Sequence, residues 1–173
     1  LLPLKNAAKT GGFWKKRQTV NRENTLPIEY RQCKDTGRID AWKLEWKPGM
    51  PNPPHIFWDS DVAKLIEAVG YSLAQFPDPK MEAMMDELID WMEKAQQPDG
   101  YLNTHFISVE PEKRWTNLRD WHELYCAGHL IEAAVAYYQG TGKRKMMDIL
   151  CRYADYIATV FGPGPDQKHG YPG

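Results

Sequence analysis

From residue 59 onward, apolar residues recur at the spacing of an α-helix, and this pattern constrains the fold more than any other feature of the chain. The predicted helices run from Asp59 or Ser60 to about Phe76, from Pro79 to about Gln96, from Leu118 to Gln139 and from Lys143 to Val160. Short connections rich in proline and glycine separate most of them. Because no strand pattern of comparable strength follows residue 59, we predict an all-α body of two antiparallel helical hairpins.

The first 58 residues differ, because prolines and glycines interrupt any helical period there. We predict an irregular N-terminal segment over residues 1–58 that wraps the helical body, with one short helix around Thr25–Lys34. The stretch Lys47–Pro54 is either an ordered, turn-rich loop or a flexible link. Residues 59–173 then form the helical hairpins.

Charge and composition exclude several classes of function. The 173 residues carry 22 Lys and Arg against 23 Asp and Glu, which argues against a protein that binds nucleic acid by neutralising phosphates. No apolar run is long enough to cross a bilayer, and the N-terminal apolar stretch is too short for a signal peptide. Three cysteines are a small and odd number, which does not suit a disulfide framework. We therefore expect a cytoplasmic protein with no membrane and no nucleic-acid partner.

The segment His122–His129 holds the densest group of reactive side chains. His122, Cys126 and His129 have the spacing that places side chains on one face of a helix. Two imidazoles and a thiolate suggest a soft-metal site, but the zinc-protease pattern HExxH is not met, because position 126 is Cys. For Cys126 and His129 we favour burial among neighbouring helices. His122 lies near the predicted helix start, where a neutral ring is favoured and can hydrogen-bond a sugar hydroxyl.

Two further segments have both a structural and a functional interpretation. In Phe57–Asp61, the carboxylates of Asp59 and Asp61 are an acid/base pair or, as we favour, groups that stabilise a helix start. The segment Gln96–Thr104 is a turn between helices or a wall of a carbohydrate pocket.

Five stretches of the chain form a recognisable series of motifs: FWKKR (Phe13–Arg17), FWDSDVAKLIEA (Phe57–Ala68), AQQPDGYLNT (Ala95–Thr104), Arg114–Ile149 and Arg152–Gly173. These motifs cover most of the chain, and in this order they resemble glycoside hydrolase family 127, whose characterised members include β-L-arabinofuranosidases. The resemblance implies that the hairpins are part of an (α/α)6 barrel, followed by β-sandwich domains. It also implies retaining hydrolysis of terminal β-L-arabinofuranosyl groups from plant-type glycans.

The resemblance also implies where the chemistry is carried out. The family uses a zinc-bound cysteine thiolate as nucleophile and a glutamate as acid/base, and all of these residues are expected beyond Gly173. Cys126 lies in the wrong motif to be this nucleophile. The position that transfers to this chain is His122, expected to hydrogen-bond the arabinofuranose. We therefore expect a fragment with no catalytic residue and no metal ligand of its own, inactive in isolation, with zinc in the full-length protein.

Two hairpins are a third of a six-hairpin barrel, so we expect the remaining polypeptide or an oligomer partner to cover the exposed helical face. Two other functions remain open. One is a non-catalytic helical module that binds carbohydrate. The other is a different α/α-barrel enzyme that acts on uronides, which would need charged groups beyond His122.

Overall fold

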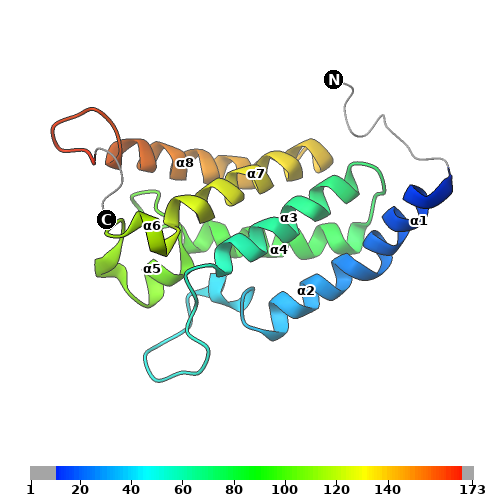
Figure 1. The fold of residues 1–173 in the computed structure, drawn as a ribbon, viewed down its shortest axis with the longest axis horizontal. Helices are drawn as coiled ribbons and strands as arrows, with labels where there is room; N and C mark the ends of the chain where they lie inside the picture. The colour runs from blue at the N-terminus through cyan, green and yellow to red at the C-terminus, as the bar shows by residue number, and fades with distance from the viewer. Residues whose placement is uncertain (1–10, 169–173) are drawn as a thin grey trace.

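The computed structural model describes residues 11–168, which contain helices and no strand (Figure 1). The α-helices are α1 (Gly12–Val20), α2 (Leu26–Asp35), α3 (Trp58–Leu73), α4 (Pro79–Ala95), α5 (Thr104–Ser108), α6 (Leu118–Trp121), α7 (Glu123–Thr141) and α8 (Lys145–Val160). A π-helical turn (Asn21–Thr25) joins α1 to α2, and short 3-10 helices cover Asp40–Lys43 and Pro111–Lys113. The prediction of an all-α fold is confirmed for these residues. The C-terminal GYPG and the N-terminal apolar stretch lie outside the described residues.

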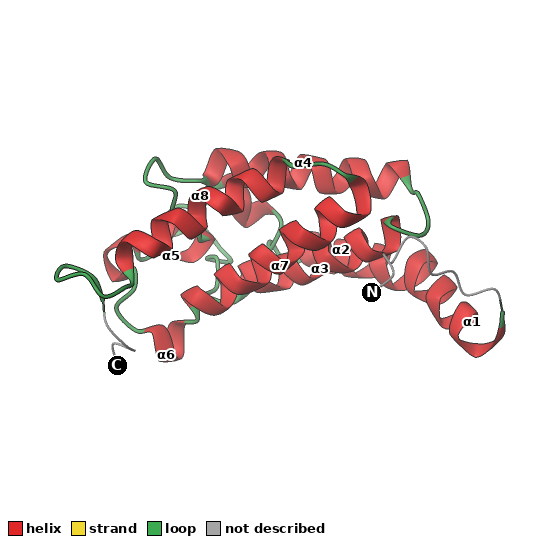
Figure 2. Ribbon diagram, turned by 90° about the horizontal axis from the view of Figure 1, so that it is seen from above, coloured by secondary structure: helices red, strands yellow, loops and turns green. Residues whose placement is uncertain are grey.

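The four long helices form the two predicted antiparallel hairpins, α3–α4 and α7–α8. Helices α3 and α7 run side by side in the same direction, and α4 and α8 lie behind them in a second layer (Figures 1 and 2). Buried apolar side chains from all four helices fill the space between the layers. None of the helices in residues 11–168 is long and apolar enough to span a membrane.

Local sequence signals explain several of the helix ends. The Asp78 carboxylate caps α4 by accepting a hydrogen bond from the Met81 amide at 3.0 Å, and Pro79 occupies the first turn, as predicted. Gly142 ends α7 with a left-handed backbone (φ 78°) that a glycine adopts without strain.

The prediction of irregular backbone in the N-terminal segment does not hold for residues 12–35. The short helix expected around Thr25–Lys34 is present as α2, but helical backbone extends back to Gly12. No proline or glycine occurs between Gly12 and Pro27, so this stretch has no helix breaker. Pro27, which cannot donate a backbone hydrogen bond, follows the wide π-helical turn. Helix α1 buries no side chain and extends away from the body (Figure 2).

The predicted helix from Leu118 to Gln139 is interrupted. His122 has a left-handed backbone (φ 58°, ψ 26°) and separates the single turn of α6 from α7. A left-handed residue cannot continue a right-handed helix. The chain therefore changes direction at His122, and α7 begins at Glu123.

Candidate functional site

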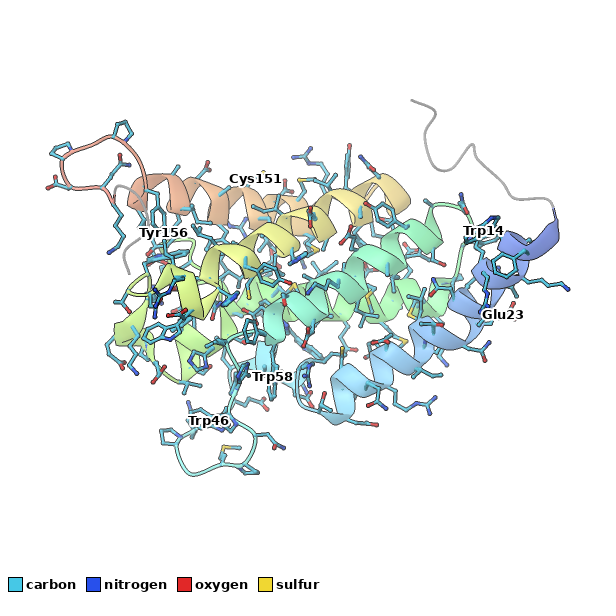
Figure 3. All side chains as sticks on the ribbon, in the orientation of Figure 1. Trp14, Glu23, Trp46, Trp58, Cys151 and Tyr156 are labelled. Atoms are coloured by element: carbon cyan, nitrogen blue, oxygen red, sulfur yellow. The ribbon has the colours of Figure 1, made fainter. Side chains whose placement is uncertain are left out.

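A surface pocket of about 840 Å³ opens where α3 and α7 begin. The chain segment before α3 supplies one wall, and Figure 3 shows Trp58 at the start of that helix. The pocket is lined by aromatic, cationic and hydroxyl-bearing side chains, namely Arg38, Pro53, His55, Phe57, Trp58, Ser60, Asp61, Lys64, His122 and Tyr125. Flat rings beside convergent polar groups are a suitable surface for a sugar.

His122 lies in the wall of this pocket with its ring held in a fixed orientation. Its Nδ1 is 2.7 Å from the carbonyl oxygen of Asp120. Because a carbonyl oxygen can only accept, Nδ1 carries the hydrogen in this contact, and Nε2 of the neutral ring is left as an acceptor. The Phe57 ring packs edge-on at 4.7 Å and the Tyr125 ring at 5.7 Å between centroids. The imidazole therefore offers Nε2 to a hydroxyl group.

A buried carboxylate fixes the first residue of α7 and with it the neighbouring His122. Glu123 has no exposed surface. It accepts hydrogen bonds from the hydroxyl of Tyr101 and from the backbone amide of Trp115, both at 2.6 Å. Burial raises the pKa of Glu123, and the two hydrogen bonds act in the opposite direction. The network ties α7 to the loops on either side of α5.

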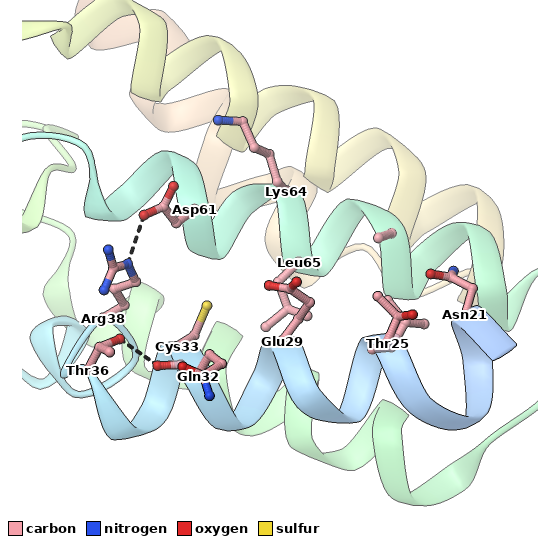
Figure 4. Close-up of a pocket in the computed structure, with 12 residues that line it drawn as sticks. Asn21, Thr25, Glu29, Gln32, Cys33, Thr36, Arg38, Asp61, Lys64 and Leu65 are labelled. Carbon is pink, nitrogen blue, oxygen red and sulfur yellow. Dashed lines mark hydrogen bonds and ion pairs between the residues drawn. The ribbon is translucent and has the colours of Figure 1, made fainter.

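The two carboxylates of the Phe57–Asp61 segment do not form a pair. Asp59 points inward, where it accepts hydrogen bonds from the amide (2.9 Å) and hydroxyl (2.6 Å) of Thr104. It caps no helix, because α3 already begins at Trp58. Asp61 instead forms an ion pair with Arg38 at 2.8 Å (Figure 4). Asp59 therefore joins the start of α3 to the start of α5, and Asp61 lines the pocket.

The burial of Asp59 should make the stability of the fold depend on pH. Burial raises its pKa to about 6 from 3.8, although Thr104 lowers it. Its stabilising contribution is therefore full below pH about 4 and is lost as the pH rises through about 6. Wild type should therefore lose roughly 2–3 kcal/mol of unfolding free energy between pH about 4 and about 7, since one pKa unit corresponds to about 1.4 kcal/mol. Asp59→Asn should not show this loss, so the difference between variant and wild type should grow by the same amount in favour of the variant. Urea denaturation at several pH values measures this difference.

The matched control is Asp166→Asn, which neutralises an exposed carboxylate and should leave the pH slope of wild type in place. A slope that persists in Asp59→Asn would assign the dependence to another group.

Sequence reasoning missed the cationic side chains of the pocket. The Arg38 guanidinium lies 5.3 Å from the centroid of the Trp58 ring. The Lys64 ammonium donates to the hydroxyl of Tyr125 at 2.9 Å. Arg38, Asp61 and Lys64 also line a groove of about 510 Å³ between α2 and α3 (Figure 4). Arg38 gives no local signal, because it lies in the segment that lacks a helical period.

The cysteines of this chain do not fit a thiolate metal site. Cys126 is buried, and its thiol donates to the carbonyl of Ile56 at 3.3 Å. Burial raises its pKa and raises that of the buried Cys33 to about 11, so both are neutral thiols. Cys151 is exposed on α8. Cys126 thus has the structural role favoured from the sequence. The same prediction is wrong for His129, whose side chain is 23% exposed and lies 3.2 Å from Glu132. Ligand atoms of a different group, Glu67, His129 and Glu132, lie within 4.8 Å of one another.

The second half of the segment Gln96–Thr104 packs in the protein interior. Its residues Tyr101 to Thr104 are buried, and none of them is among the pocket-lining side chains. Tyr101 contacts Trp115, Tyr153 and Tyr156 edge-on. The sequence left two interpretations of this segment open, a turn between helices and a wall of a carbohydrate pocket. Its buried residues pack against neighbouring segments and do not form a wall of this pocket.

Comparison with known proteins identifies the family. Residues 8–173 match the family model described as β-L-arabinofuranosidase, GH127 catalytic domain. The chain is 32% identical, over 97% of its length, to a non-reducing end β-L-arabinofuranosidase of Bifidobacterium longum subsp. longum, and it covers 29% of that protein.

Two solved structures are also similar. A GH127 β-L-arabinofuranosidase from Geobacillus stearothermophilus T6 superposes with a TM-score of 0.87 at 46% identity, over 92% of this chain and 26% of that one. A GH127 β-arabinofuranosidase superposes with a TM-score of 0.86 at 35% identity, over 99% of this chain and 29% of that one. The chain thus spans less than a third of these relatives, and its hairpins correspond to part of their helical catalytic domain. The chain belongs to the GH127 β-L-arabinofuranosidase family.

Proposed function

We propose that this chain is the first part of the catalytic domain of a retaining glycoside hydrolase that releases terminal β-L-arabinofuranosyl groups from plant-type glycans. The observation that carries the proposal is His122, whose ring nitrogen Nε2 is free to accept from a hydroxyl in a pocket with aromatic walls. The relatives named above, which are arabinofuranosidases, support the choice of sugar.

The polar and the aromatic side chains of the pocket contact different parts of the sugar. Nε2 of His122 accepts a hydrogen bond from a sugar hydroxyl, while Arg38 and Lys64 supply donors for ring or glycosidic oxygens. The rings of Phe57 and Trp58 cover the apolar face of a pentose and exclude water. Together these contacts hold and orient a neutral sugar.

The bond-breaking groups belong to the rest of the protein in this proposal. A retaining mechanism needs a nucleophile and an acid/base residue close together, and the buried neutral thiols and Glu123 do not provide them. Zinc in the full-length protein would lower the pKa of a cysteine nucleophile held outside this chain. The isolated chain is then inactive.

The remaining polypeptide or an oligomer partner covers the exposed apolar side chains of α3 and α7, which include Tyr71, Ile131, Val135 and Tyr138. The sparse, unpaired cysteines support a cytoplasmic location.

Substitution of His122 tests the proposal. In a protein that joins this chain to the rest of its catalytic domain, His122→Ala should lower kcat/KM for a chromogenic β-L-arabinofuranoside by about 10- to 100-fold. This corresponds to about 1–3 kcal/mol of transition-state stabilisation from a lost hydrogen bond. Steady-state kinetics on both arabinofuranosides and uronides also tests the alternative of an α/α-barrel enzyme that acts on uronides, because that enzyme would turn over uronides instead of arabinofuranosides.

His122→Asn is the matched control for the backbone, because asparagine tolerates the left-handed conformation that alanine resists. A loss that is equal in both variants comes from the missing imidazole, whereas a loss confined to alanine comes from backbone strain. Unchanged kinetics in both variants, or hydrolysis by the isolated 173 residues, would contradict the proposed role of this chain.

A further inference from the structure

A second group of polar side chains lies on the surface shared by α3 and α7. Glu67 comes from α3, and His129 and Glu132 come from α7. Ligand atoms of the three residues lie within 4.8 Å of one another. None of the three lines the pocket that contains His122. The group is therefore separate from the candidate sugar site.

The backbones that carry these residues are held at a fixed distance. A Cβ on Gly70 would lie 2.9 Å from backbone atoms of Ala136 and Tyr137, so α3 and α7 are in backbone contact there. Gly70 is one helical turn beyond Glu67, and Ala136 is one turn beyond Glu132. The side chains are thus presented from two rigid elements rather than from a loop, which is the arrangement that favours a preformed site.

The histidine is positioned for ligation. The Tyr125 ring packs edge-on against the His129 ring at 4.5 Å. Nδ1 of His129 is buried, makes no hydrogen bond within residues 11–168, and lies 3.2 Å from Oε2 of Glu132. The Tyr71 phenol hydrogen-bonds Glu67 and orients that carboxylate, as outer partners of metal ligands commonly do.

The group carries two carboxylates, and the described part of the chain balances their charge only in part. Ion pairs of lysine and arginine in residues 11–168 go to other carboxylates. The nearby Lys64 ammonium is directed to Tyr125 and Ser60. The recorded ionic contact of the two carboxylates is the one between Glu132 and the imidazole of His129, and a bound metal cation would balance the remaining negative charge.

We propose that Glu67, His129 and Glu132 bind a divalent transition-metal ion of the zinc class. One nitrogen and two oxygen ligands suit zinc, whereas magnesium and calcium prefer oxygen alone. Ligand atoms around a tetrahedral zinc ion, at bond lengths of about 2.0–2.2 Å, lie about 3.4 Å apart. Nδ1 of His129 and Oε2 of Glu132 are already 3.2 Å apart, and rotation of the glutamate side chains would bring all three ligand atoms, which lie within 4.8 Å of one another, to this spacing. Three protein ligands leave an open position for water or an exogenous group.

Metal titration of the chain tests this site. Zn²⁺ should bind with one ion per chain by calorimetry and should raise Tm, because a ligand that binds only the folded state stabilises it. Co²⁺ in place of zinc should give visible absorption bands of nitrogen and oxygen ligation. His129→Ala should abolish the bands, and Glu132→Gln should weaken binding at least about tenfold, since even changes to outer partners cost 10- to 100-fold. Mg²⁺ in excess should not displace Zn²⁺.

The controls are Cys151→Ser and His55→Ala, which remove exposed ligands outside the group and should leave affinity unchanged. Glu132→Gln changes an exposed side chain, so it keeps the test valid if His129→Ala fails to fold. Affinity that is insensitive to Glu132 and His129, or a cobalt spectrum with thiolate bands that disappear in Cys151→Ser, would overturn the proposal.

Discussion

Gly140→Ala should destabilise the chain by at least about 3 kcal/mol, although alanine is the better helix former. A Cβ at this position would lie 2.3 Å from the carbonyl oxygen of Gly70 and 3.1 Å from its carbon. Both obstructing atoms belong to the backbone of α3 and cannot rotate away. Overpacking costs typically about 1–3 kcal/mol where side chains can adjust, so a backbone collision lies at or above this range. Urea denaturation followed by circular dichroism measures the loss.

Gly128→Ala is the matched control on the same helix. A Cβ there would meet nothing within 4 Å. This substitution should therefore stabilise the chain by up to about 1 kcal/mol, the usual gain of alanine over glycine in a helix. Opposite signs for two identical substitutions on α7 would demonstrate the close contact with α3. Equal effects would show that the two helices are not in backbone contact.

Glu123→Ala is the second substitution with a large expected effect. It removes the acceptor of two short hydrogen bonds and leaves the Tyr101 hydroxyl and the Trp115 amide buried without partners. Each unsatisfied buried group costs about 1–3 kcal/mol, so we expect a loss of about 3–5 kcal/mol in the free energy of unfolding. His122 would lose its fixed orientation as well, because it directly precedes Glu123.

Glu123→Gln separates the charge from the hydrogen bonds. The amide oxygen can still accept from Trp115, and the amide group can donate to the oxygen of Tyr101. Burial raises the pKa of Glu123, so a neutral replacement should keep most of the stability. Glu112→Ala, at an exposed position, should change the unfolding free energy by less than about 0.5 kcal/mol. A loss in Glu123→Gln as large as in Glu123→Ala would show that the negative charge itself is required.

The sequence contains enough local information to predict the long helices and their pairing. The apolar period locates α3, α4, α7 and α8, and Asp78 followed by Pro79 predicts the start of α4. The break at His122 could not be predicted in this way. Its left-handed backbone directly precedes Glu123, whose partners Tyr101 and Trp115 come from other segments. Tertiary hydrogen bonds therefore override a continuous helical pattern at this residue.

The pocket was predictable only in part, for the same reason. His122 and the aromatic residues of Phe57–Trp58 were identifiable from the motifs they lie in. Arg38 and Lys64 reach the pocket through the packing of α2 and α3, which no local pattern encodes. The helix-capping role favoured for Asp59 was wrong, because α3 already begins at Trp58 and the partner of Asp59, Thr104, is 45 residues away.

The geometry of the His122 pocket has a consequence for folding. One wall lies before and within the start of α3 and the other at the start of α7, so neither hairpin contains a complete binding surface by itself. The pocket exists only after two segments far apart in the sequence have docked, a non-local step that comes late when loop closure must precede it. During folding, the protein should consequently gain ligand affinity in a single cooperative step. In the same step the slowest-exchanging amides of α3 and α7 should become protected from hydrogen exchange.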